Sequence, residues 1–258
     1  MGITTILSAS RQAFYEFLAR PVWIFEMTVS PFVFATVALI MFRNSPSTNT
    51  TYIVAAAGIM GMWGSTLLGA GYSVVIERYF GTLQYLFASP SSLEEIIAGK
   101  ALTSAVMGLW NLIFVFLIAF VLYGMDIKIS HPFAFVGALL LCMLSFSALG
   151  ILLSTLFVLS RSAAALGNIL EFTAFVVCGI MYPLSFLPVW VRPLSYVLTP
   201  TWGAQILRWT VIEPQLGQGF YSGVVMIGVL SVVYMVAGHY LYSKIDYQVR
   251  VTATLWRF

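Results

Sequence analysis

Residues Phe133–Leu159 read FAFVGALLLCMLSFSALGILLSTLFVL, a run of 27 residues without a charged side chain. A helix needs about 20 apolar residues to cross the hydrocarbon core of a bilayer, so this segment is long enough to span a membrane. It also lacks the alternation of polar and apolar residues that is typical of a membrane β-strand. The segment therefore predicts an all-α polytopic membrane protein.

The composition of the whole chain agrees with that prediction. Of its 258 residues, 60% are hydrophobic and 8% are charged, whereas about 25% of the residues of an ordinary soluble domain are charged. The net charge of +3 is small and scattered, unlike the basic footprint of a nucleic-acid-binding protein. Soluble enzymes, disordered chains and nucleic-acid partners are therefore all disfavoured.

Six apolar runs are long enough to cross a bilayer. We expect the spans at residues 22–42, 52–76, 101–123, 133–159, 162–184 and 220–243 of a single domain over residues 1–258. If both termini are cytoplasmic, the cytoplasmic cations are Arg11, Arg20, Arg78, Lys100, Arg161, Lys244, Arg250 and Arg257, and the external ones are Arg43, Lys128, Arg192 and Arg208. This excess predicts cytoplasmic termini by the positive-inside rule.

Residues 1–20 precede the first span and have an amphipathic pattern. One helical face gathers Ile6, Leu7, Ala13, Phe14, Phe17 and Leu18. We predict an interfacial helix on the cytoplasmic leaflet. The alternative is an ordinary frayed terminus.

The predicted cytoplasmic stretch between spans two and three, Glu77–Lys100, reads ERYFGTLQYLFASPSSLEEIIAGK. Its first part, residues 77–95, contains a short amphipathic segment between Gly81 and Pro90. Ser91 or Ser92 can cap the next helix, with two glutamates in its first turn where the helix dipole favours acids. The residues alone leave two interpretations open: a docking surface for a partner, or a lid that closes the hairpin.

The predicted external stretch Gly179–Arg208 contains four prolines, which one straight spanning helix cannot accommodate. Its tryptophans and tyrosines suit the level of the lipid headgroups. We expect residues 185–212 to form short, partly re-entrant helices. An aromatic loop at the membrane interface is the alternative.

Small residues recur every four positions along the second span, at Ala57, Gly61, Ser65, Gly69 and Ser73. Such a stripe lets another helix backbone approach closely. It can pack within the chain, contact a second subunit, or form the wall of a pathway.

Isolated polar groups in the apolar runs have structural interpretations. Glu26 and Glu171 should face protein or water, near the cytoplasmic edge beside a partner such as Arg20 or Arg161. Binding of a substrate or a proton is the alternative for these two glutamates. Asn111, near the middle of span three, is expected to form an interhelical hydrogen bond. The two histidines and two cysteines are too scattered for a metal site or a disulfide framework.

The two unusual stretches resemble the hallmarks of ABC-2 type transporter permeases. In the first, the residues that fit the family pattern are Glu77, Gly81, Thr82, Leu83, Leu86, Ser89 and Pro90, whereas Tyr79, Phe80 and Gln84 depart from it. In the second, the residues that fit are Gly179, Pro183, Leu187, Pro188, Trp190, Pro200, Leu207 and Arg208. The resemblance covers essentially the whole chain.

The resemblance implies a six-span exporter subunit in a bacterial cytoplasmic membrane. Residues of the first stretch, Gln84 included, would form a coupling helix that docks on an ATPase. Those of the second, from Gly179 to Pro200, would form the external gate. Because the chain has no G-x-x-x-x-G-K-[ST] sequence, ATP and Mg²⁺ would bind a separate P-loop ATPase subunit. A second permease subunit would complete the pathway, and the substrate would be a drug, a lipid or a lipid-linked glycan.

Two other functions remain as alternatives. An intramembrane enzyme needs converging nucleophiles, acids or metal ligands, which the sequence does not offer. An ATP-independent channel or secondary carrier needs polar groups at the midplane or broken helices. Uncharged spans argue against it, and transport without ATP would favour it.

Overall fold

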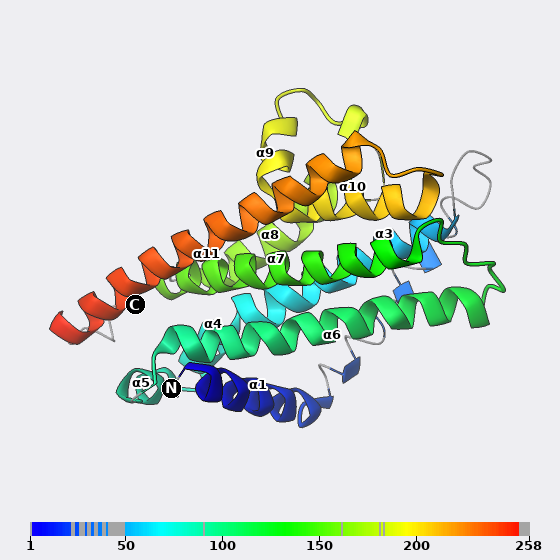
Figure 1. Ribbon diagram of the computed structural model, residues 1–258. Coiled ribbons are helices and arrows are strands. Elements are labelled where there is room, and N and C mark those ends of the chain that lie inside the picture. Colours follow the sequence, from blue (N-terminus) through cyan, green and yellow to red (C-terminus); the bar gives the residue numbers. More distant parts are fainter. Residues whose placement is uncertain are drawn as a thin grey trace.

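The computed structural model describes residues 2–21, 24–25, 29, 32–33, 36–37, 40, 50–89, 91–160, 162–180, 182 and 184–252. The predicted first span, residues 22–42, falls largely outside these residues, as do Glu26, Pro90, Arg161 and Pro183. Every regular element of the described residues is a helix (Figure 1). The all-α expectation is therefore confirmed, whereas the six-span layout stays a prediction.

The long helices form a bundle, and shorter helices lie at both of its ends. They are α1 (Gly2–Leu18), α3 (Thr50–Thr66), the π-helix η1 (Leu67–Gly71), α4 (Ser73–Tyr79), α5 (Leu83–Ala88), α6 (Leu93–Val121), α7 (Pro132–Leu159), α8 (Ala163–Val177), the 3₁₀ turn η2 (Leu184–Phe186), α9 (Arg192–Val197), α10 (Thr199–Ile212) and α11 (Gln218–Thr252). The start of α1, α5 and the C-terminal end of α11 lie at the same end of the bundle (Figure 1).

Four helical segments of the described residues are long and apolar enough to cross a membrane. They are Thr51–Gly71, Leu93–Val121, Pro132–Val158 and Gln218–Tyr247. They coincide with the second, third, fourth and sixth predicted spans. The chain is thus an integral membrane protein by the length and composition of its helices.

Helix α6 begins at Leu93, where Ser92 caps it by accepting a hydrogen bond from the backbone N–H of Glu95 at 3.3 Å. This cap is as expected, and most of the predicted span at residues 101–123 lies inside the helix. One predicted boundary was wrong. Helix α8 has only 15 residues and ends at Val177, although we expected a span to residue 184. It ends there because Gly179 adopts a left-handed conformation with φ +59°, a common helix stop.

Helix α3 lies at the centre of the bundle, and its close neighbour is α6. A side chain at Gly58 would meet Leu112 Cδ1 at 2.6 Å, and one at Gly61 would meet Asn111 Cβ at 3.0 Å. Asn111 Nδ2 also donates a hydrogen bond to Gly61 O at 3.1 Å, which confirms the expected interhelical bond. The glycines therefore permit a backbone-to-backbone approach that any larger residue would block.

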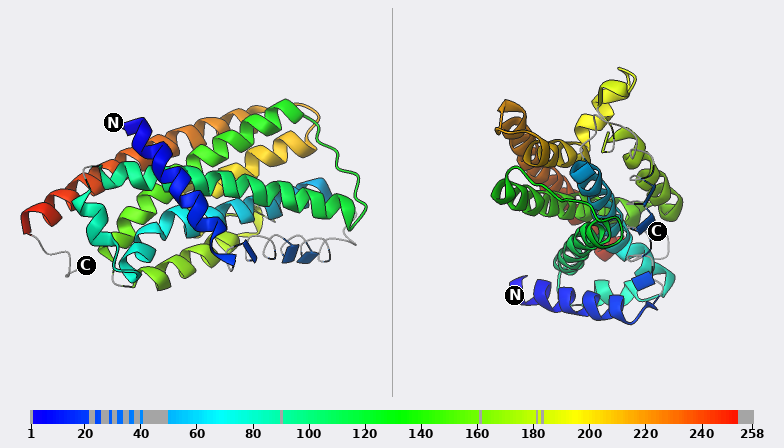
Figure 2. Two further views of the ribbon diagram at one scale, coloured as in Figure 1. Left: turned by 90° about the horizontal axis from the view of Figure 1, so that it is seen from below. Right: turned by 90° about the vertical axis from the view of Figure 1, so that its right-hand side faces the viewer.

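Helix α1 crosses the long helices obliquely (Figure 2). It packs on α6 at Gly99, where a side chain would come within 2.7 Å of Ala9 Cβ. The hydroxyls of Ser10 and Thr103 lie 2.9 Å apart across the same contact. This packing fixes α1 to the bundle, and its position on a membrane leaflet stays a prediction.

Candidate functional site

The stretch between α4 and α6 is anchored by a buried ion pair. Lys100 Nζ lies 2.5 Å from Glu77 Oε1, and the two side chains are 9% and 14% exposed. Thr82 Oγ1 donates a hydrogen bond to the other carboxylate oxygen of Glu77. The pair joins the end of α4 to the first turns of α6.

The environment of Glu77 favours its charged form. Burial alone would raise the pKa of Glu77, but hydrogen bonds from Lys100 and Thr82 and the positive charges of Lys100 and Arg20 hold it below the ordinary value of 4.5. The carboxylate is therefore ionised near neutral pH and keeps its partners.

A second anchor ties the same region to α7. The guanidinium of Arg78 donates to the carbonyl oxygens of Val158 at 2.5 Å and Ser160 at 3.1 Å. These carbonyls lie at the C-terminal end of α7, where a cation also interacts favourably with the helix dipole. Arg78 thus connects the predicted coupling segment to a second long helix.

Helix α4 ends in a tight turn at Gly81. The N–H of Gly81 donates to Arg78 O at 3.1 Å and the N–H of Thr82 donates to Glu77 O at 2.9 Å, which is the pattern of a Schellman cap. Gly81 adopts a left-handed φ of +72°, a conformation that costs other L-residues roughly 1–2 kcal/mol. This turn redirects the chain into α5.

The two faces of the segment differ in exposure. Leu83 is buried in a cluster formed with Val74, Leu93, Ile97, Val158, Tyr242 and Ile245, and Leu86 packs against it. By contrast, Gln84, Phe80, Tyr85 and Tyr79 are exposed, Tyr79 to 86%. The leucines expected at a docking face therefore contact the chain's own core. The exposed surface consists of Gln84, one of the expected coupling residues, and of three aromatic residues that were not expected there.

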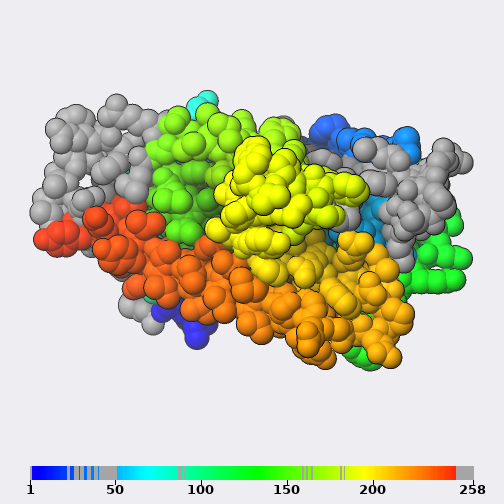
Figure 3. Space-filling view, turned by 90° about the horizontal axis from the view of Figure 1, so that it is seen from above, coloured from blue at the N-terminus to red at the C-terminus, as the bar shows by residue number. Residues whose placement is uncertain are grey.

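The predicted external gate forms a compact segment around α9 and the start of α10. It stands out from the rest of the bundle (Figures 1 and 3). Leu187 and Pro200 are buried, whereas Trp190 is 81% exposed. Hydrogen bonds from Ser195 Oγ to Val177 O, at 2.7 Å, and from Thr201 Oγ1 to Ser195 O, at 2.6 Å, hold the segment on the end of α8.

The small-residue stripe, which runs from Ala57 in α3 to Ser73 in α4, both packs within the chain and lines a cavity. Ala57, Gly61 and Gly69 contact α6 or lie in the core, so part of the stripe packs within the chain. Gly61, Ser65, Gly69 and Ser73, together with Gly64, also line a cavity. The two interpretations of the stripe are therefore compatible.

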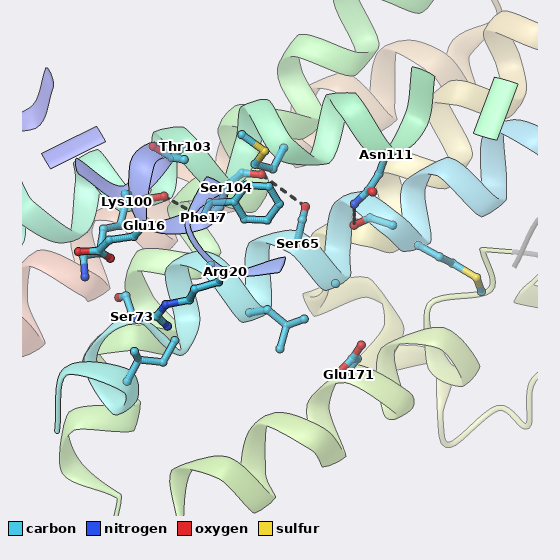
Figure 4. A pocket seen from close by; sticks show the side chains of 18 of the residues that line it. Glu16, Phe17, Arg20, Ser65, Ser73, Lys100, Thr103, Ser104, Asn111 and Glu171 are labelled. Carbon is cyan, nitrogen blue, oxygen red and sulfur yellow. Dashed lines mark hydrogen bonds between the residues drawn. The ribbon is translucent and has the colours of Figure 1, made fainter. Parts of the chain in front are cut away.

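This cavity, of about 100 Å³, lies between α1, α3, α6 and α8 (Figure 4). Its polar lining includes Arg20, Ser65, Lys100, Ser104, Asn111 and Glu171. Apolar walls come from Met60, Met107 and Phe175. The cavity combines polar and apolar walls, and it is smaller than the roughly 300–1,000 Å³ of most small-molecule sites.

Glu171 lies in the second half of α8. Its carboxylate faces Gly64, where a Cβ would lie 3.7 Å from Glu171 Oε1. Arg20, one of its expected partners, lines the same cavity, and the position of Glu171 near the cytoplasmic edge of the membrane stays a prediction.

One further contact between side chains, the hydrogen bond between His239 and Glu94, was not expected from the sequence. His239 Nδ1 lies 2.9 Å from Glu94 Oε2 and ties the start of α6 to α11. The residues are far apart in sequence, and no local pattern joins them. Within the described ranges, no three His, Cys, Asp or Glu side chains gather as they would around a metal ion.

These features define a helical membrane domain. At one end it carries an anchored segment between α4 and α6, residues 77–90, which we call the connector. Between its helices lies a cavity lined by both polar and apolar side chains. The family model for ABC-2 type transporters matches residues 4–212, and the chain belongs to this family. A search of curated proteins found no match. The chain is accordingly the membrane component of an ABC transporter, in a family whose membrane subunits are generally not enzymes.

Proposed function

We propose that this chain is the permease subunit of an ATP-driven exporter that moves an amphiphilic substrate out across a bacterial cytoplasmic membrane. ATP and Mg²⁺ bind a separate P-loop ATPase subunit, and a second permease subunit, identical or closely related, completes the pathway. Both termini lie in the cytoplasm, on the side of that ATPase.

The observation that supports this proposal most directly is the construction of the connector between α4 and α6. Its aromatic side chains are exposed, while its base is anchored to α6 by Lys100 and to α7 by Arg78. A surface that is open to a partner and fixed to two spanning helices can transmit a displacement of that partner. The segment from Glu77 to Pro90 is therefore assigned the coupling role.

The mechanism follows from differential stabilisation of two states. ATP binding draws the two ATPase subunits together, and the docked connectors move with them. Because the Glu77–Lys100 pair and Arg78 make each connector continuous with its helices, α4, α6 and α7 tilt as a unit. The cavity then opens outward past the α9 segment, which acts as the external gate.

Purification of the tagged chain from its native membranes, followed by identification of its partners, tests the proposal. A stoichiometric P-loop ATPase is expected with the wild type. Replacement of the exposed aromatics by serine at Tyr79, Phe80 and Tyr85 should release this partner, since these residues form the docking surface. Trp190→Ser, at an equally exposed aromatic on the α9 segment, is the matched control and should retain it.

Two results would overturn this assignment. Full retention of the ATPase by the triple variant would remove the docking role of the connector. A clean homo-oligomer with no ATPase from the wild type, and transport without ATP, would instead favour the ATP-independent channel or secondary carrier.

A further inference from the structure

A second cavity, of about 480 Å³, lies beside the α9 segment. Its residues come from the start of α3, the turn after α8, α9, α10 and the start of α11. Tyr52, Cys178 and Thr201 are buried and form its floor, whereas Tyr196 and Arg208 are exposed and lie at its rim. Its volume falls within the roughly 300–1,000 Å³ that is typical of a small-molecule site.

Arg208 gives this second cavity a positive charge. None of the described residues that line it is acidic. The guanidinium Cζ lies 5.6 Å from the centre of the Tyr52 ring, and the group forms no hydrogen bond or ion pair with any residue that the structure describes. By contrast, Arg192 in α9 donates to the carbonyl oxygens of Leu187 at 3.1 Å and Ser185 at 3.0 Å. The guanidinium of Arg208 is therefore open to a ligand.

Most other donors on the walls of this cavity are already used. Tyr52, Thr201, Trp202 and Ser222 each donate their side-chain proton to a backbone carbonyl oxygen, at 2.6, 2.6, 2.9 and 3.1 Å. A guanidinium has five N–H donors in a planar fork that fits a carboxylate or a phosphate. An anionic group therefore finds its strongest partner at Arg208.

Aromatic rings in the same cavity offer a surface to the apolar part of a ligand. The ring centroids of Tyr196 and Trp202 lie 5.5 Å apart, and the indole N–H of Trp202 is bound to Tyr196 O. Trp202, Gln205 and Arg208 recur at every third position of α10, so they follow one another along one side of the helix. At a rise of about 1.5 Å for each residue, Trp202 and Arg208 are separated by roughly 9 Å along the helix axis.

We propose that this cavity binds the anionic group of an amphiphile, a carboxylate or a phosphate, whose flat apolar body lies against Tyr196 and Trp202. Arg208 donates to the anion, and the ring of Tyr52 keeps the guanidinium in place. The separation along α10 requires a short chain between the two parts of the ligand. This inference rests on the proposed transport function, for which it names the substrate class at the predicted external gate.

Equilibrium binding to the purified full chain in phosphatidylcholine nanodiscs tests this site without requiring the ATPase. The probe is 4-(1-pyrenyl)butyrate, a flat fluorophore joined by a propyl chain to a carboxylate that is ionised at pH 7, and the signal of protein-free nanodiscs is subtracted. The corresponding butanamide is the matched neutral ligand, with the same ring and chain. Arg208→Gln removes the positive charge, and Lys128→Gln, at an exposed lysine between α6 and α7, is the control for loss of one positive charge elsewhere.

The wild type should bind the carboxylate at least about fivefold more tightly than the amide, because only the carboxylate forms a charge-assisted pair with the guanidinium. Arg208→Gln should abolish this preference, whereas Lys128→Gln should leave it unchanged. Trp202→Leu should weaken the binding of both ligands alike, since it removes the aromatic surface and keeps the charge. Equal binding of the two ligands by the wild type would overturn the proposal, and this comparison needs no variant to fold.

The source of the ligand and the transport function are tested separately. Binding of the pyrenyl carboxylate should persist when phosphatidylglycerol replaces part of the phosphatidylcholine. Its displacement by phosphatidylglycerol would make a membrane lipid the occupant of the cavity and overturn the substrate assignment. If the two ligands bind equally while the complex still exports another amphiphile with ATP, the site assignment fails and the permease function stands.

Discussion

The Glu77–Lys100 pair should stabilise the connector far more than a surface ion pair does. Exposed pairs contribute roughly 0.2–1 kcal/mol, whereas breaking a buried pair by removing one partner costs roughly 3–5 kcal/mol. Both of these side chains are largely buried, with their charged atoms 2.5 Å apart. Thr82 and the charge of Arg20 still act on Glu77 after Lys100 is removed, so Lys100→Met should cost about 3 kcal/mol.

A double-mutant cycle isolates the pair. The variants are Lys100→Met, Glu77→Gln and the double variant, with unfolding followed by tryptophan fluorescence during a titration with denaturing detergent. Because Glu77→Gln removes the charge that Lys100 neutralises, the double variant should be less destabilised than the sum of the two single variants by about 2 kcal/mol. Lys128→Met, at an exposed lysine, should lie within about 0.5 kcal/mol of the wild type.

A small coupling energy would refute this reasoning. A value below about 1 kcal/mol would mean that water screens the two charges as it does at a surface. The connector would then be held by Arg78 and by the packing of Leu83, and the ion pair could not make α4 and α6 move as one unit.

Three further predictions follow from the backbone and from the charge of Glu77. Gly81→Ala and Gly124→Ala both place a side chain at a positive φ, of +72° and +58°, with open space around it. Each should lower the free energy of unfolding by about 1–2 kcal/mol. Only Gly81→Ala should also lower ATP hydrolysis by the purified complex. Gly58→Ala should destabilise the α3–α6 packing in the same detergent titration because its Cβ would meet Leu112, whereas Gly228→Ala, which meets nothing within 4 Å, should be neutral or stabilising. The pKa of Glu77 is lower in the folded chain, so its stabilising effect is present above pH 4.5, its ordinary pKa, and is lost as the pH falls through the folded-state pKa. The difference in Tm between the wild type and Glu77→Gln should therefore shrink below pH 4.5. A difference that grows there would contradict the lowered pKa.

The sequence was sufficient for those parts of the fold that depend on the length of apolar runs and on local backbone chemistry. The uncharged run at Phe133–Leu159 coincides with α7, and the serine before two glutamates caps α6 as expected. The interhelical bond of Asn111 also followed from a simple rule, because a buried amide in an apolar helix needs a partner on another helix. Each of these features depends on residues that are close together in the sequence or on a single side chain.

The orientation of the connector could not be predicted from its sequence. The pattern of Leu83 and Leu86 indicates which residues share a face, but a face can bind a partner or pack on its own chain. The outcome depends on Val158 and Tyr242, which approach from α7 and α11. The opposite charges of Glu77 and Lys100, at the two ends of one hairpin, were the local signal that could have identified the anchor.

The surroundings of Glu171 could not be predicted from its own segment. The apolar pattern continues beyond Val177, whereas the helix stops at the left-handed backbone conformation of Gly179. Glu171 lies opposite Gly64, where a Cβ would be 3.7 Å from its Oε1. The small-residue stripe and the isolated acid looked independent in the sequence, and both line one cavity. The packing of α8 against α3 brings them together, and no pattern within either segment records that packing.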